Sequence, residues 1–108
     1  MERIRADQFD VAAPGANTNI LNDSLTPTAT CLMRVTVALN AASVFNVTFT
    51  RGGSTRTFGL NGSVALAAND LYIFDFNVSV LDVINFQVET DTIIRKLHVS
   101  EIQNSDGA

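Results

Sequence analysis

The sequence is poor in the residues that most often carry catalysis or bind metal ions. Its 108 residues include one cysteine, Cys31, one histidine, His98, one tyrosine and no tryptophan. A nucleophilic site needs a nucleophile beside a base, and nothing in the sequence marks a serine as the partner of His98. Structural zinc needs several closely spaced ligands, which this chain does not offer. We therefore expect no enzyme activity, no catalytic residue, no cofactor and no metal ligand.

Cys31 and His98 each have an ordinary structural explanation. Cys31 begins an apolar strand face and is expected to be a small core residue rather than a reactive thiol. His98 lies in an alternating strand pattern and is expected to face solvent. Neither residue is therefore a candidate for chemistry.

Calcium is the metal that the sequence leaves open. Asn69, Asp70 and Asp75, or Asp82 with Asp91, could meet at one end of a β-sandwich. No calcium-binding loop is recognisable, and Asn and Asp residues are common at turns for backbone reasons alone. We interpret these five residues as turn and surface residues.

Charge and long apolar runs are also scarce. Charged residues make up 17% of the chain, with a net charge of −4, and the seven basic residues are scattered along it. Nucleic-acid binding needs a concentrated cationic surface. A membrane-spanning helix needs roughly 18 consecutive apolar residues. We therefore expect neither nucleic acid nor a membrane as a partner. The first residues contain no apolar segment typical of a secretory signal, so we expect synthesis in the cytoplasm.

Short runs that alternate between apolar and polar residues fill most of the chain. Such alternation with a period of two is typical of half-buried β-strands, and no helical periodicity is evident. In the clearest run, Met33, Val35 and Val37 share one face with Cys31 and Leu39. The predicted strands are Thr30–Leu39, Ser43–Thr50, Thr55–Leu60, Ser63–Leu66, Leu71–Val78, Val83–Thr90 and Thr92–Ile102.

Turn residues between these runs predict how neighbouring strands are joined. Gly52–Gly53 and Asn61–Gly62 are both expected to form tight hairpin turns, because such turns need a positive φ. In the last strand the alternation is interrupted, which predicts a β-bulge near Arg95 and Lys96. In the strand before it, Asn85 is expected to point outward.

The predicted fold class is all-β, a single jelly-roll-like antiparallel β-sandwich with a short N-terminal arm. Residues 29–108 form the sandwich body. Residues 1–28, interrupted by two prolines and many polar residues, form the arm, with one or two short edge strands at Phe9–Ala12 and Asn19–Leu21. We expect loss of residues 1–13 to weaken attachment to a partner more than it lowers the melting temperature.

One predicted strand is apolar on both faces. Tyr72, Phe74 and Phe76 share one face, while Leu71 and Ile73 lie on the other. Such a strand must be covered twice, either by the N-terminal arm or by another subunit. We favour another subunit, so Leu71 and Ile73 are the candidate self-association residues of a homodimer or homotrimer.

The stretch from Leu71 to Ile102 resembles the C-terminal half of small jelly-roll proteins of tailed-bacteriophage particles. The resemblance is carried by Leu71–Phe76, Val83–Val88 and Ile93–Val99. Capsid decoration or cement proteins are among these proteins. The resemblance implies a viral structural protein that self-associates and staples neighbouring capsid subunits. Its expected partner is the major capsid protein, and its expected location is the capsid surface of the virion.

Another function remains open from the residues alone. A carbohydrate-binding or receptor-binding β-sandwich module, such as a phage fibre or spike domain or an adhesin domain, can have similar strands. It would use side-chain amides and an aromatic platform on one sheet. Asn85, Gln87 and Tyr72 are the candidates for that role, although exposed aromatic residues are few.

Overall fold

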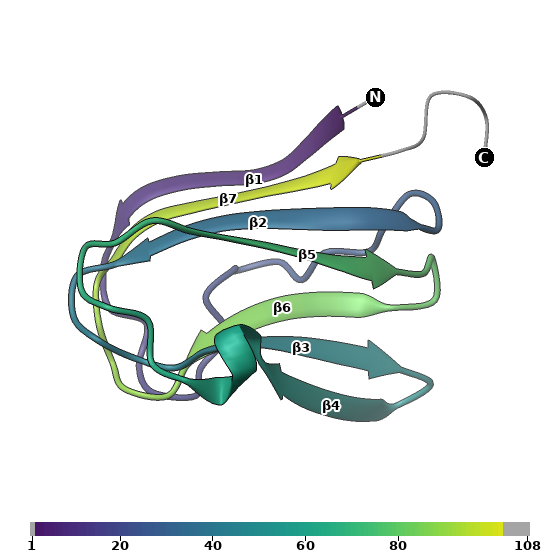
Figure 1. Ribbon diagram of the computed structural model, residues 1–108. Coiled ribbons are helices and arrows are strands. Elements are labelled where there is room, and N and C mark those ends of the chain that lie inside the picture. Colours follow the sequence, from purple (N-terminus) through teal and green to yellow (C-terminus); the bar gives the residue numbers. More distant parts are fainter. Residues whose placement is uncertain (1, 103–108) are drawn as a thin grey trace.

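The computed structural model describes residues 2–102, and these form a nearly all-β sandwich (Figure 1). No helix among them is long and apolar enough to cross a membrane. The regular elements are β1 (Glu2–Val11), β2 (Cys31–Leu39), β3 (Phe45–Arg51), β4 (Ser54–Gly59), the short 3-10 helix η1 (Leu60–Ser63), β5 (Tyr72–Val78), β6 (Val83–Val88) and β7 (Ile94–Ile102).

The strands form two antiparallel sheets. One has the order β1-β7-β2-β5, and the other has the order β4-β3-β6. The segment from Asn17 to Leu25 extends the second sheet, because its backbone bonds to β6: Asn17 N–H donates to Val88, and Leu25 and Ile84 bond to each other in both directions at 2.7–2.8 Å. Each sheet therefore has four extended segments.

The pairing of these segments defines a jelly roll. The first segment pairs with the last (β1 with β7), the second with the seventh (residues 17–25 with β6), the third with the sixth (β2 with β5), and the fourth with the fifth (β3 with β4). The chain is thus one long hairpin rolled into a sandwich, the arrangement of a double-sheet jelly roll. The expected fold class is confirmed.

The core lies between the two sheets and is built by the alternating residues. Met33, Val35, Val37 and Leu39 of β2 are fully buried, as is Phe86 of β6. Burying such side chains is the main source of stability in a domain of this size. The alternation read from the sequence therefore gave the correct inward face of the clearest strand.

Two turn predictions are also confirmed. Gly52 and Gly53 have φ values of 58° and 83° and join β3 to β4, with Arg51 paired to Ser54. The ladder between β2 and β7 shifts at Arg95, because Ala38 pairs with Lys96 whereas Leu39 pairs with Ile94. This shift is the predicted bulge.

The predicted hairpin at Asn61–Gly62 is wrong. Both residues have φ of 62°, as a tight turn requires, but they lie in η1 and the chain does not return along β4. Leu66 is instead fully buried and forms an isolated β-bridge with Ser43, two residues before β3. Burial of this leucine outweighs the local turn preference. Gly59 permits the tight path, because a Cβ there would lie 2.8 Å from the Cα of Ser63.

The N-terminal segment differs most from the expectation. Residues 2–11 form one ten-residue edge strand that pairs along β7, rather than a short strand in an arm. Ile20, Leu21 and Leu25 are buried in the core. The segment before residue 28 is therefore part of the sandwich. Its polar sequence concealed this, because β1 exposes most of its side chains.

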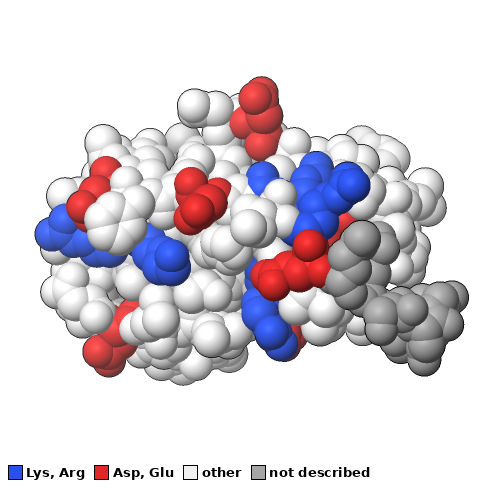
Figure 2. Space-filling model, turned by 90° about the horizontal axis from the view of Figure 1, so that it is seen from above, with Lys and Arg blue, Asp and Glu red and all other residues white. Residues whose placement is uncertain are grey.

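Charged side chains are spread over the surface. In Figure 2 basic and acidic atoms lie beside one another, and uncharged residues cover most of the face shown. Four of the arginines form ion pairs within the described chain: Arg5 with Glu101, Arg34 with Asp75, Arg51 with Asp82, and Arg95 with Asp10.

Deleting residues 1–13 should destabilise the isolated protein. The deletion removes β1 and leaves the buried carboxylate of Glu101 without Arg5, and breaking a buried ion pair in this way costs about 3 kcal/mol or more. Thermal and urea unfolding measure the effect. Replacing Ile4 of β1, which is 60% exposed, with Ser is the control and should change stability by less than about 0.5 kcal/mol. An unchanged melting temperature for the deletion variant would support the expectation that the N-terminal residues form an arm outside the sandwich body.

Candidate functional site

One apolar surface feature lies at the free edge of β5. Leu71 and Ile73 are each 60% exposed, which is unusual for large apolar side chains so close together. The described N-terminal segment does not cover them, since β1 lies at the opposite edge of the same sheet. Among residues 2–102, β5 pairs with β2 alone. Its other edge therefore has no strand partner there.

Aromatic residues lie behind this edge. Tyr72 and Phe74 of β5 stack with ring centroids 6.1 Å apart, and both are half-buried. Phe76 meets Phe49 edge to face at 5.7 Å, and Phe49 meets Phe58 of β4 in the same way. Phe58 is itself 52% exposed. The sandwich is thus incompletely closed along the side where β5 and β4 are the outermost strands.

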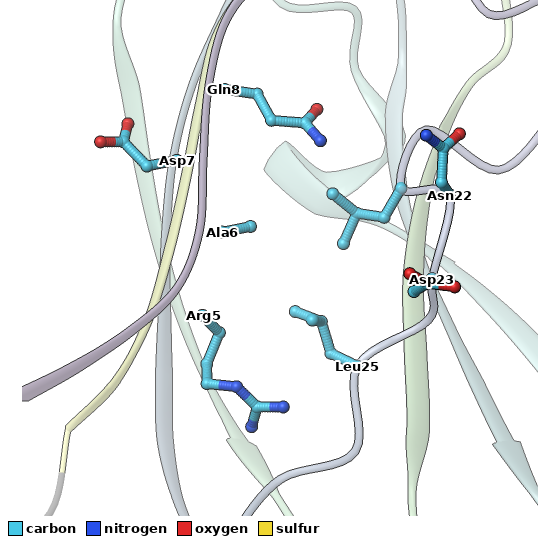
Figure 3. Close-up of a pocket in the computed structure, with 8 residues that line it drawn as sticks. Arg5, Ala6, Asp7, Gln8, Asn22, Asp23 and Leu25 are labelled. Carbon is cyan, nitrogen blue, oxygen red and sulfur yellow. The ribbon is translucent and has the colours of Figure 1, made fainter.

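An open hollow lies at the opposite side, between β1 and the segment 20–25. Its volume is about 370 Å³, and Arg5, Ala6, Gln8 and Leu25 are among its lining residues. Figure 3 shows the Gln8 amide pointing into the hollow and Asp7 pointing away from it. The Gln8 Oε1 atom is buried without a hydrogen-bond partner in the described chain. A water molecule can satisfy such an acceptor.

Below this hollow a buried carboxylate joins three parts of the chain. Glu101 of β7 is 1% exposed. Its Oε1 accepts from the Thr28 hydroxyl at 2.6 Å, and its Oε2 accepts from the Arg5 guanidinium, which also donates to the Thr26 carbonyl at 2.9 Å. Burial raises the pKa of the Glu101 carboxyl, but hydrogen bonds from Thr28 and Arg5 outweigh it and lower the pKa overall. Glu101 is therefore charged and structural at neutral pH.

Cys31 lies beside this network. It is partly buried rather than a full core residue, with its Sγ 4.0 Å from Glu101 Oε1. Burial raises the pKa of the Cys31 thiol, the Glu101 charge raises it further, and Arg5 opposes both. Because the thiolate is the reactive form, this environment makes Cys31 a poor nucleophile.

His98 does not complete a catalytic arrangement with its neighbours. Its Nδ1 lies 3.6 Å from Asp7 Oδ1 on the outer face of the first sheet, and its side chain is 23% exposed, less than expected for a solvent-facing residue. Ser100 lies two residues further along the same strand. Its Oγ is buried and has no hydrogen-bond partner among the described residues. The contact between nucleophile and base that a triad requires is therefore not made.

The three residues considered for sugar recognition are engaged in the fold. Asn85 is 2% exposed, and its amide bonds to the backbone of Leu21 in both directions at 3.0 Å. We expected Asn85 to point outward and be exposed to solvent, but residues 21–24 cover it and bury its side chain. The Gln87 amide donates to Asn19 at 2.9 Å, and the Tyr72 hydroxyl accepts from the Ala67 N–H at 2.9 Å.

The acidic residues considered for calcium are also separated. Asp75 binds Arg34 through two bonds of 2.8 and 2.9 Å, and Asp82 binds Arg51 at 2.7 Å. Asp91 accepts from the Gly15 N–H. In the part of the chain that the structure describes, no group of three or more His, Cys, Asp or Glu side chains could hold a metal ion.

No protein-family model matches this chain, and no curated protein sequence matches it at a significant level. The geometry described above therefore carries the functional argument. Sequence alternation placed Leu71 and Ile73 on the face opposite Tyr72 and Phe74, and both are exposed in the structure. The Glu101 network escaped it, because residues 5, 28 and 101 are far apart in the chain and no local pattern links them.

Replacing Glu101 with Gln should lower stability by about 2 kcal/mol at pH 7, since hydrogen bonds to a charged group contribute about this much. Because the folded-state pKa of Glu101 lies below its ordinary value of 4.5, this stabilisation is present above that value and is lost as pH falls through the folded-state pKa. Urea unfolding between pH 7 and about pH 3 should therefore show the two proteins converging in acid. A constant difference across that range would contradict the assignment.

Two arginines of β1 provide a matched comparison. Replacing Arg5 with Ala should cost about 2–3 kcal/mol of stability, because it leaves the buried Glu101 carboxylate without its cation. Replacing the exposed Arg3 with Ala should change stability by less than about 0.5 kcal/mol. Equal effects of the two substitutions in urea unfolding would show that the Arg5–Glu101 pair does not anchor β1.

Proposed function

We propose that this protein is a structural component of a virus particle, a capsid decoration or cement protein that self-associates and staples neighbouring capsid subunits. It acts by binding and assembly rather than by catalysis. Its partners are a second copy of itself and the major capsid protein, and its location is the capsid surface. The exposed pair Leu71 and Ile73 is the observation that carries this proposal.

The first support is the need of this pair for a partner. Isolated exposed leucines and isoleucines are common on soluble proteins, but clustered ones mark contact surfaces. Here Ile73 projects from an edge strand and Leu71 immediately precedes that strand, whose other face carries half-buried aromatics. A protein of 108 residues that leaves such a surface open is suited to assembly.

The second support is that the side chains needed by the sugar-binding alternative are already bonded within the fold. Jelly rolls occur both in viral capsid proteins and in lectins, so the fold alone does not separate the two functions. The side chains required by the sugar-binding alternative, Asn85, Gln87 and Tyr72, already bond within the chain. A binder of this kind would have to break those bonds to reach a glycan.

Capsids of the virus that carries the gene provide the direct test. The purified protein should co-sediment with assembled capsids and saturate at a fixed number of copies per capsid. Unassembled capsid subunits should bind it more weakly, because a staple contacts more than one subunit. A glycan array, probed in parallel with the same protein, should give no specific signal.

Two results would contradict the proposal. One is absence of binding to assembled capsids at micromolar concentrations of a protein shown to be folded by circular dichroism. The other is specific binding to a glycan, which would favour the sugar-binding alternative.

A further inference from the structure

We infer that β5 pairs antiparallel with β5 of a second copy, so that the two four-stranded sheets join into one continuous sheet across a two-fold axis. This inference rests on the self-association in the proposed function and specifies its surface and symmetry. The inference follows from a comparison of the free strand edges of the molecule.

The edge at β1 is protected against strand addition. Its ladder with β7 is interrupted between Ile4 and Ala6, so Arg5 is an extra residue whose guanidinium turns inward to Glu101. Asp10 has a φ of 50°, which bends the end of the strand. Bulges and inward-pointing charges are the devices by which natural sheets block edge-to-edge pairing.

The edge at β4 lacks the apolar surface that pairing would bury. The first five of its six residues, Ser54 to Phe58, are exposed, and Phe58 is the one large apolar side chain among them. Arg56 lies at its centre. A charged side chain in the middle of a short edge strand also disfavours addition of another strand.

The edge at β5 has no bulge, and its central charge is already paired within the chain. Its seven residues contain no proline and no glycine, and its register with β2 runs without a shift from Val37–Tyr72 to Cys31–Val78. Its one charged residue, Asp75, lies on the outer face of the sheet. There Arg34 of the neighbouring strand β2 donates two hydrogen bonds to it. No backbone hydrogen bond from elsewhere in residues 2–102 reaches this free edge. Such an edge is open to β-augmentation.

The same strand can pair with itself without opposing like charges. A two-fold axis at Asp75 would place the two carboxylates opposite each other, which is unfavourable. An axis at Phe74 pairs residues 71–77 with the same residues of the second copy. It then brings Tyr72 opposite Phe76 twice on the inner face, and aromatic cross-strand pairs are favourable. The half-buried aromatic side chains would gain cover from their counterparts.

This pairing would bring Leu71 and Ile73 to the junction between the two copies. On the outer face of the joined sheet, Ile73 would lie beside Asp75 of the second copy, and Leu71 beside Asn77. Main-chain hydrogen bonds would supply the affinity, and the side chains would exclude water from the junction. The product is a dimer with one eight-stranded sheet, whose remaining outer surfaces stay free for capsid subunits.

The test is the oligomeric state of the full chain and of single variants, measured by sedimentation equilibrium. The wild-type protein should be a dimer at tens of micromolar. Ile73→Glu should weaken dimerisation roughly 100-fold or more, because the new carboxylate of each copy would lie opposite Asp75 of the second copy. Ile4→Glu is the matched control, since Ile4 has the same 60% exposure on the same sheet but at the β1 edge. It should dimerise like the wild type.

A second control separates edge pairing from stacking of two outer faces. Thr36 of β2 lies opposite Ile73, one strand in from the edge. Thr36→Glu should leave the dimer intact if the edges pair. Loss of the dimer in Thr36→Glu, a wild-type monomer, or a closed trimer would each overturn the inference. Capsid binding by a monomeric wild-type protein would overturn edge pairing and self-association but not the attachment to capsids. A dimer that fails to bind capsids would overturn the attachment to capsids but not edge pairing.

Discussion

The buried carboxylate of Glu101 is the interaction on which the closed form of this sandwich depends. It lies near the end of β7, the strand between β1 and β2, and binds Arg5 from β1 and Thr28 from the chain entering β2. A lone buried carboxylate is costly, so the loss of either partner should destabilise the fold. This network fixes β1 to the rest of the sandwich, although most side chains of β1 are exposed and contribute little to the core.

The sequence was sufficient to predict the parts of the fold that local patterns determine. Alternation placed Met33, Val35 and Val37 in the core, and two consecutive glycines gave the turn between β3 and β4. An interrupted alternation located the bulge at Arg95. In each case the determining signal lies within a few residues of the structure that it specifies.

What the sequence could not reveal depends on contacts between distant residues. The polar composition of residues 2–11 indicates an exposed segment, and nothing nearby shows that β7 holds it in register. Asn85 occupies an outward position, yet it is covered because its amide matches the backbone of Leu21. Asn61–Gly62 forms its turn, but the burial of Leu66 decides where the chain goes next. Distant packing overrides local preference at all three places.

The edge strands β1, β4 and β5 differ in chemistry: β1 is interrupted by a bulge, β4 is polar, and the free edge of β5 is open. Amide hydrogen exchange of residues 71–78, compared with that of β1 in the same sample, tests this account most directly. As the protein is concentrated from well below to well above its dimerisation constant, amides at the free edge of β5 should become protected, while those of β1 should not change. Exchange from β5 that is independent of concentration would contradict the account.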